Sequence, residues 1–288
     1  MKAELKNMHV LVAGATGYLG GYIIKELAEQ NIAYKAIASS PQKLIALETD
    51  QVMKAEVTQA ETLGGICAGM DVVISTVGIT GQKNGLSYMD VDYQANLNLL
   101  REAQKAGVKK FIYISAFNGD KMRQLKIFQA KEAFVDELKK SGLDYTVMRP
   151  NGFFSDMLDF LKMAKRGRVY LFGSGQYRLN PIHGADVAEV VVDTIHSTER
   201  EINLGGPDIL TQNEIAALAL DTWYKDVKII HLPDWTRRLS ISLLRTFTSS
   251  KTYGPIEFFL TAMAMNKVAP RCGRHRLYEF FKSETEQS

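Results

Sequence analysis

The sequence is poor in the features that mark several specialised classes of protein. It has two cysteines, Cys67 and Cys272, too few and too far apart for a disulfide framework or a cysteine-based metal site. Its five histidines show no metal-binding spacing with cysteine or carboxylate, so we expect no metal centre. No apolar run reaches the roughly 18 residues of a membrane-spanning helix, which excludes an integral membrane span.

The sequence also lacks a large excess of charge of either sign. The formal net charge of +3 is too small to indicate a nucleic-acid-binding protein. The first ten residues, MKAELKNMHV, carry charges where a signal peptide has its apolar segment, so we expect a cytoplasmic protein. The stretch 223–276 is locally basic, with ten Lys or Arg against three acids. It is either a solvated face or a surface that attracts phosphate or anionic lipid.

The first half of the chain alternates short apolar segments with amphipathic ones. The predicted strands are His9–Ala13, Tyr34–Ala38, Gln51–Ala55, Val72–Thr76, Phe111–Ser115 and Tyr145–Arg149. Most are apolar on both faces, as in a parallel sheet that is covered on both sides. The predicted helices between them include Tyr22–Gln30, Tyr93–Ala106 and Lys126–Ser141. This alternation predicts an α/β fold with a Rossmann-type doubly wound parallel sheet.

The second half has a looser pattern, which we interpret as a smaller, mainly helical C-terminal lobe for the substrate. We expect a single domain over residues 1–288, with a dinucleotide-binding core at about 7–150 and the lobe at about 151–288. Within the lobe, Asp234–Ser249 is predicted to be an amphipathic helix. We expect this helix to cap the lobe; a lid and a membrane-surface helix are the alternatives.

Three glycines separate the first predicted strand from the helix after it. Gly14 allows a sharp turn, Gly17 lets a pyrophosphate approach the backbone, and Gly20 lets the helix pack closely. The helix N-terminus then offers N–H groups and a partial positive charge to the phosphates. The expected cofactor contacts of this turn are Gly14, Thr16, Gly17, Tyr18, Leu19 and Gly20.

The end of the second predicted strand indicates which dinucleotide is bound. An NAD site places Asp or Glu there, which would repel a 2′-phosphate. Residues 38–43 read ASSPQK, so Ser39, Ser40 and Lys43 are available to a phosphate instead. This favours NADP(H), and NAD(H) stays open because no arginine is present. Glu56 is placed either to meet the adenine edge or as an ordinary surface carboxylate.

Several motifs together resemble the atypical short-chain dehydrogenase/reductases, in particular the NmrA-like and divinyl chlorophyllide reductase-like branch. In the first half they are Gly14–Gly20, Asp71–Gly78, Val91–Asn96, Phe111–Ser115 and Arg149–Phe154. Gly173–Gly175, Pro181–Ala188 and Asn203–Pro207 extend the likeness, which covers roughly residues 7–215. The motifs are specific for fold and cofactor and poor guides to the substrate.

The resemblance implies roles for single residues. Ser115 takes the place of the catalytic serine. Lys131 matches the lysine that hydrogen-bonds the nicotinamide ribose and lowers the pKa of the proton donor. The remaining residues implied to lie beside the cofactor are Thr76, Val77, Gly78, Pro150, Asn151, Gly152 and Phe153.

One position departs from the family pattern. The family's proton donor is a tyrosine four residues before the lysine, so that both side chains face the cofactor. Here that position is Ile127, which argues against ordinary alcohol–ketone chemistry. Hydride transfer to a polarised C=C stays open, with the proton taken from water, Lys131, Tyr88 or Tyr93. A quinone or flavin-like acceptor and a bound dinucleotide without chemistry stay open as well.

Two hypotheses follow. The first is a reductase that transfers a hydride from NADP(H) to a conjugated or quinone-like small molecule. The second is a non-catalytic, NmrA-like dinucleotide sensor or assembly factor. We expect a small-molecule substrate and no nucleic acid, and we leave a homo-oligomer or a protein partner open.

The cofactor assignment can be tested at Lys43. We predict that Lys43→Glu weakens NADPH binding far more than NADH binding, because only NADPH carries the 2′-phosphate that a carboxylate repels. Titration of the purified variant with each cofactor measures the two losses. Equal losses would contradict the phosphate assignment.

Overall fold

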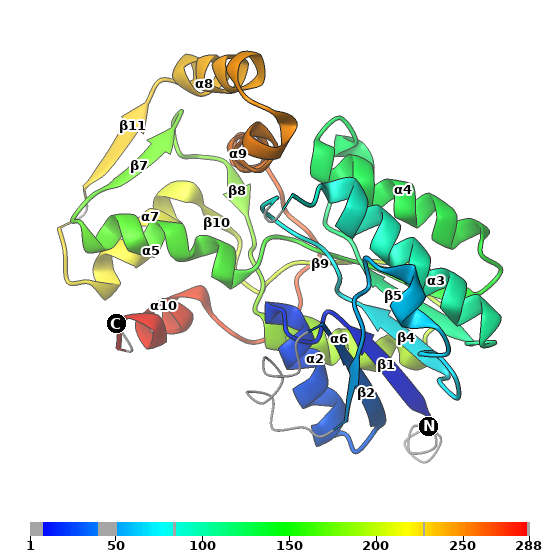
Figure 1. Ribbon diagram of the computed structural model, residues 1–288. Coiled ribbons are helices and arrows are strands. Elements are labelled where there is room, and N and C mark those ends of the chain that lie inside the picture. Colours follow the sequence, from blue (N-terminus) through cyan, green and yellow to red (C-terminus); the bar gives the residue numbers. More distant parts are fainter. Residues whose placement is uncertain (1–7, 40–50, 83–84, 227, 287–288) are drawn as a thin grey trace. The chain divides into compact units, whose positions relative to one another are not determined.

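A seven-stranded sheet forms the centre of the first half of the molecule (Figure 1). The computed structural model describes residues 8–39, 51–82, 85–226 and 228–286. In the order of the sheet, the strands are β3 (Val52–Lys54), β2 (Ala33–Ala38), β1 (His9–Ala13), β4 (Val72–Ser75), β5 (Lys110–Ile114), β6 (Asp144–Pro150) and β9 (Glu201–Leu204). Adjacent strands from β3 to β6 pair in parallel. The predicted Rossmann-type sheet is confirmed.

Helices cover both faces of this sheet. Figure 1 shows α2 (Tyr18–Glu29) and α6 (Gly184–Asp193) on one face, and α3 (Asn96–Lys105) and α4 (Lys126–Lys140) on the other. The central strands are apolar on both sides, because helices shield both faces of the sheet from water. Tyr113 of β5 packs edge-on against Phe134 of α4, with ring centroids 4.6 Å apart and both rings fully buried.

The order of the strands reverses between β1 and β4. From β1 the chain continues to β2 and β3 on one side, and then returns to β4 on the other side. In open parallel sheets, ligands bind outside the carboxyl ends of the strands at such a switch point. Here these ends are Ala13, followed by Gly14, and Ser75, followed by Thr76.

Two predicted helices begin later than the observed ones. The helix predicted from Tyr22 begins at Tyr18, so Gly20 and Gly21 lie inside its first turn despite the low helix propensity of glycine. The helix predicted from Tyr93 is preceded by a π-helical segment, Met89–Ala95, and becomes α-helical at Asn96. The single-turn helices of the 3₁₀ type are Ala60–Leu63, Asp120–Met122, Phe154–Met157 and Thr194–His196.

The chain divides into two units. The first holds residues 1–115, 119–149 and 187–202, and the second holds 116–118, 150–186 and 203–288. The elements of the second unit are α5 (Leu158–Lys165), β7 (Val169–Phe172), β8 (Arg178–Leu179), β10 (Leu210–Thr211), α7 (Gln212–Thr222), β11 (Ile229–Leu232), α8 (Asp234–Phe247), α9 (Ser250–Ala262) and α10 (Leu277–Glu286). Its strands form only two-stranded sheets, so the C-terminal region is mainly helical, as predicted.

The second unit has its own hydrophobic core. Phe154, Phe160 and Phe281 are its largest fully buried side chains. Buried residues of α5, α7 and α10 complete this core. Among the described helices of the whole chain, none combines the length and the hydropathy needed to cross a membrane.

Candidate functional site

The packing of α2 against β1 requires two of the three glycines. Gly14 has a φ of +82°, and a Cβ there would lie 2.4 Å from Oγ1 of Thr76. A Cβ at Gly20 would lie 2.2 Å from the carbonyl oxygen of Gly14. Both distances are far below van der Waals contact. A side chain at Gly14 would displace the segment that follows β4, and one at Gly20 would push α2 away from the turn after β1. These two glycines are therefore explained by the protein's own packing.

Gly17 is different, because the protein itself does not exclude a side chain there. Its φ of −81° and ψ of 168° suit any residue. The nearest atom to a Cβ, the Gly14 carbonyl oxygen, would be 3.2 Å away. Gly17 is exposed and stands directly before the first turn of α2. Its missing side chain leaves a cradle over the helix N-terminus that a Cβ would fill.

The N-terminus of α2 is suited to an anion. None of its described side chains caps it, and its first turn contains no acidic residue. Unpaired amide groups and the helix dipole favour negative charge at such an end. Thr16 and Tyr18 are exposed beside Gly17, whereas the side chain of Leu19 is buried in the core.

The residues expected near a 2′-phosphate are only partly described. Ser39 is exposed directly after β2, and Ser40 and Lys43 lie outside the described residues. Glu56 is half-buried and accepts hydrogen bonds from the backbone N–H of Thr58 at 3.2 Å and from its hydroxyl at 2.9 Å. Its carboxylate therefore stabilises a local turn, and its role toward adenine stays a prediction.

A buried ion pair lies beside the segment that follows β4. Nζ of Lys131 is 2.8 Å from Oδ1 of Asp92, and the two side chains are 13% and 0% exposed. A Cβ at Gly78 would lie 2.6 Å from that Asp92 oxygen and 2.8 Å from the Lys131 nitrogen. The backbone N–H of Ile79 donates to the other Asp92 oxygen at 3.3 Å. Gly78 is thus the position at which the chain passes directly over the pair.

The charges of this pair depend on each other. Burial by itself lowers the pKa of Lys131, but the Asp92 carboxylate and the Tyr113 hydroxyl outweigh it, so the pKa is raised. Burial raises the pKa of Asp92, against the opposing effect of the Lys131 ammonium. We conclude that Lys131 is a cation at neutral pH, because its buried counter-charge holds the proton on it. Sequence reasoning missed Asp92, which lies directly before the predicted helix Tyr93–Ala106; a carboxylate within the motif Val91–Asn96 was the available signal.

Ser115 lies in a different polar cluster. It is 4% exposed, and its hydroxyl donates to Oε1 of Glu132 at 2.7 Å. Glu132 in turn accepts two hydrogen bonds from Arg149, at 2.6 and 2.9 Å. The hydroxyl therefore belongs to a buried ion pair between α4 and β6, and a catalytic role for Ser115 stays a prediction. Glu132 was not predicted; a charge on the apolar face of a helix was the available signal.

The tyrosine candidates differ in their surroundings. The hydroxyl of Tyr88 donates to the carbonyl oxygen of Thr80 at 2.8 Å, and burial raises its pKa to about 12. Tyr93 is half-buried. Ile127 is 4% exposed and lies in the core of the first unit, so α4 presents no hydroxyl one turn before Lys131.

The segment Pro150–Phe153 is anchored inside the second unit. The side-chain amide of Asn151 donates to Oδ1 of Asn180 at 2.8 Å and to the carbonyl oxygen of Lys267 at 2.7 Å. The carbonyl oxygen of Gly152 accepts from the N–H of Ile182, and that of Pro150 accepts from Phe117. These bonds fix the backbone, and contact of this segment with a nicotinamide stays a prediction.

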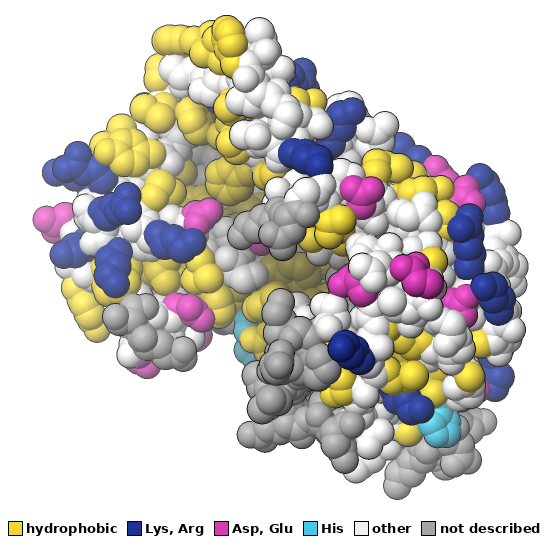
Figure 2. Space-filling model, in the orientation of Figure 1, with side chains coloured by type: hydrophobic (Ala, Val, Ile, Leu, Met, Phe, Trp, Pro, Cys, Tyr) yellow, Lys and Arg dark blue, Asp and Glu magenta, His cyan; other side chains and the backbone are white. Residues whose placement is uncertain are grey.

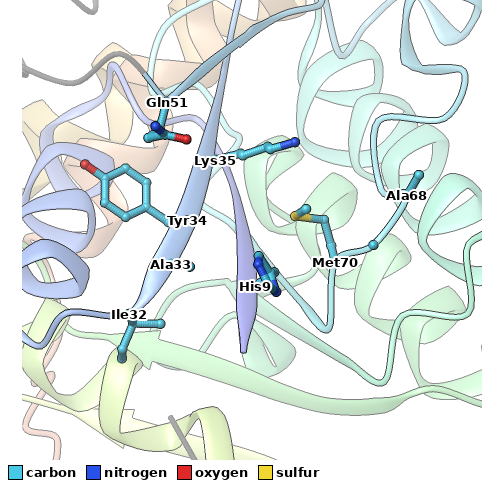
Figure 3. Close-up of a pocket in the computed structure, with 9 residues that line it drawn as sticks. His9, Ile32, Ala33, Tyr34, Lys35, Gln51, Ala68 and Met70 are labelled. Carbon is cyan, nitrogen blue, oxygen red and sulfur yellow. The ribbon is translucent and has the colours of Figure 1, made fainter. Parts of the chain in front are cut away.

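Two pockets lie away from these groups. One of about 620 Å³ opens at the amino ends of β1 and β2, where His9, Ala33 and Tyr34 line it (Figure 3). This is the edge of the sheet opposite the glycine turn, so it is not the site that the turn predicts. The other, of about 350 Å³, includes the stacked rings of His183 and His275 in the second unit. Among the described residues, no group of three His, Cys, Asp or Glu is placed to hold a metal ion.

Comparisons with known proteins agree with the fold. A family profile described as NAD(P)H-binding matches residues 14–198. The chloroplastic divinyl chlorophyllide a 8-vinyl-reductase of Arabidopsis thaliana is 27% identical over 94% of this chain and 72% of its own length. The photosystem II assembly factor Ycf39 of Synechocystis is 30% identical over 52% of this chain and 47% of its own. An NADPH-dependent quinone oxidoreductase from Escherichia coli, solved with NADPH, superposes with a TM-score of 0.71 at 19% identity, over 96% of this chain and 99% of that one.

The cluster around Ser115 generates a stability prediction. We expect Glu132→Gln to lower the free energy of unfolding by about 3 kcal/mol, because it removes the fully buried one of the two carboxylates, Glu132 and Glu201, that pair with the buried Arg149 guanidinium. Arg123→Ala is the matched control, since it removes an ion pair with Asp136 in which both side chains are more than 40% exposed. That change should cost less than about 1 kcal/mol. Urea unfolding measures both, and equal losses would contradict the buried pair.

Proposed function

Because this chain belongs to the NAD(P)H-binding family, we propose that it is an NADP(H)-dependent reductase that transfers a hydride to a conjugated or quinone-like small molecule. One observation carries this proposal. The open cradle at Gly17 and the buried Lys131–Asp92 pair both lie at the carboxyl ends of β1 and β4, where the strand order reverses. Phosphate binding and a fixed cation at one edge are what a dinucleotide reductase requires.

The dinucleotide is proposed to bind with its pyrophosphate at the N-terminus of α2. Gly14 and Gly20 hold the turn in shape, and the exposed backbone at Gly17 accommodates the phosphates. The absence of an acid in residues 38–43 supports NADP(H) over NAD(H), with Ser39, Ser40 and Lys43 as its 2′-phosphate contacts. Membership of the family covers both cofactors, so the preference for NADP(H) rests on residues 38–43 alone.

The bound cofactor supplies the hydride, and the residues of the chain decide which acceptor can use it. Lys131 is a cation held in place by Asp92, so it can donate a hydrogen bond to the nicotinamide ribose or to the acceptor. Ile127 offers no proton to an alkoxide. A polarised C=C or a quinone, which spreads the negative charge before protonation, suits this arrangement better than a simple ketone. The names of the vinyl-reductase relative and of the quinone oxidoreductase agree with both acceptor classes.

A non-catalytic dinucleotide sensor or assembly factor is the second candidate. Ile127 at the tyrosine position favours it, and so does the engagement of the Ser115 hydroxyl with Glu132. The relative named as a photosystem II assembly factor is similar over half of this chain. The cytoplasmic location stays a prediction, since the vinyl-reductase relative is chloroplastic. Oligomeric state and a protein partner stay open too.

Dinucleotide binding is tested at Gly17. We predict that Gly17→Val weakens NADPH binding by at least about tenfold, or about 1.4 kcal/mol, because the side chain fills the cradle. The loss of thermal stability should be small, since the backbone angles suit valine and only the Gly14 carbonyl oxygen, 3.2 Å from the new Cβ, has to shift. Gly64→Val, at an exposed position with no atom near its Cβ, is the matched control and should bind normally. Unchanged NADPH affinity in the Gly17 variant would overturn the proposed binding mode.

The chemistry is tested by following NADPH absorbance against a panel of quinones, conjugated enones and tetrapyrroles. We predict that at least one class of acceptor oxidises NADPH in the presence of the protein, and that Lys131→Ala abolishes this oxidation. Asp92→Asn should shift the loss of activity to lower pH on the alkaline side. Without the carboxylate, only Tyr113 opposes the lowering of the Lys131 pKa by burial. Tight NADPH binding with no oxidation by any member of the panel would favour the sensor instead.

A further inference from the structure

Helix α8 carries a row of exposed apolar side chains that the proposed reductase function does not use. Trp235, Leu239, Leu243 and Phe247 are 63%, 47%, 48% and 78% exposed. They are spaced four residues apart, so they follow one another along the same side of the helix. Figure 2 shows hydrophobic side chains gathered over α8. No residue of this helix is buried.

The opposite side of α8 is the one that packs on its own unit. The Arg237 side chain is 13% exposed, and Ser240 and Leu244, three and seven residues on, are partly buried. α8 packs against α9 and approaches β7. The apolar row therefore points away from the second unit, and nothing in that unit covers it among the described residues.

Two exposed arginines of α8 lie outside the row, on its polar side. Arg238 and Arg245 are seven residues apart, and their side chains are 76% and 56% exposed. Helix periodicity places both about 120–140° from the centre of the apolar row, on the same flank. Asp234 and Glu257 are their ion-pair partners, yet α8 itself contains three arginines and one acid. The surrounding stretch 223–276 has ten basic residues and three acidic ones. The face is thus apolar with a cationic flank.

We propose that α8 binds the surface of an anionic phospholipid bilayer. The apolar row enters the boundary between headgroups and acyl chains, and the 76% exposed side chain of Arg238 reaches the phosphates. The helix has 14 residues and is about 21 Å long, so it lies in the plane of the interface and does not span the bilayer. Trp235 near one end and Phe247 at the other are side chains that favour this boundary.

The charge pattern favours lipid over a second copy of the chain. A contact between two copies through this row would join two identical helices that each carry three arginines and one acid, and this like charge opposes association. An anionic bilayer instead supplies a counter-charge along the whole flank. The docking is independent of dinucleotide binding, because α8 belongs to the second unit and the glycine turn to the first.

The test uses the full chain and vesicles of defined composition. The sequence has two tryptophans, so Trp223→Phe leaves Trp235 as the only indole. We expect this protein to sediment with vesicles of equal parts phosphatidylcholine and phosphatidylglycerol, with a blue shift of its emission as Trp235 leaves water. Vesicles of phosphatidylcholine alone should bind it several-fold more weakly, and added salt should weaken binding to the anionic vesicles.

Variants distinguish vesicle binding through the apolar row from non-specific adsorption of the protein. The triple change Leu239→Ser, Leu243→Ser and Phe247→Ser should reduce vesicle affinity by at least about tenfold while far-UV circular dichroism and thermal unfolding stay unchanged. Leu86→Ser with Met89→Ser, at exposed positions of the first unit, is the matched control and should bind like the parent. Arg238→Gln should weaken anionic binding about fivefold. Arg245 is kept, because Glu257 is buried against it.

Three results would overturn the proposal. The first is the absence of sedimentation with anionic vesicles, and the second is equal binding to neutral and anionic vesicles. The third is a dimer in analytical ultracentrifugation that the triple variant dissociates, without any vesicle binding by the parent; the row would then be a contact between two copies. None of these results bears on NADPH affinity, so they leave the proposed reductase function untouched.

Discussion

The close approach of α2 to β1 is the constraint on which the candidate site depends. It is possible only because Gly20 has no side chain, since a Cβ there would lie 2.2 Å from the Gly14 carbonyl oxygen. Gly14 in turn leaves room for Thr76, which follows β4. The helix can therefore begin directly at the carboxyl end of the central strand, where the strand order reverses. Its N-terminus then faces the same edge of the sheet as the end of β4, and Gly17 keeps that surface clear.

The first unit contains two buried ion pairs, and neighbouring residues of α4 supply one member of each. Lys131 pairs with Asp92, and Glu132 pairs with Arg149 and binds the Ser115 hydroxyl. Burying single charges is costly, so each is tolerated only with its partner in place. In this way one helix supplies a fixed cation beside the segment after β4 and locks β5 to β6. The Ser115 hydroxyl is therefore bound to the Glu132–Arg149 pair, and Lys131 is the charged group beside Gly78.

The two proposals concern different parts of the molecule and different physical effects. The reductase proposal rests on the backbone and charges of the first unit, where a missing side chain and a buried pair meet at one strand edge. The membrane proposal rests on the exposed row of α8 in the second unit. If both hold, the protein would bring its dinucleotide chemistry to a lipid surface, where conjugated, poorly water-soluble acceptors accumulate.

The sequence alone determined the sheet, because strand and helix patterns are local. All six predicted strands exist with ends shifted by one residue at most, and the glycine turn lies between β1 and α2 as expected. β9 was missed: Glu201–Leu204 alternates polar and apolar residues, but four residues are too few to indicate a strand, and the segment joins the sheet next to β6 only in the fold. The tertiary structure also decided the partners of Lys131, Ser115 and Glu132, since Asp92 and Arg149 belong to other elements than α4 and meet it only in the fold. Which buried charges face each other depends on how strands and helices pack, and no local pattern carries that information.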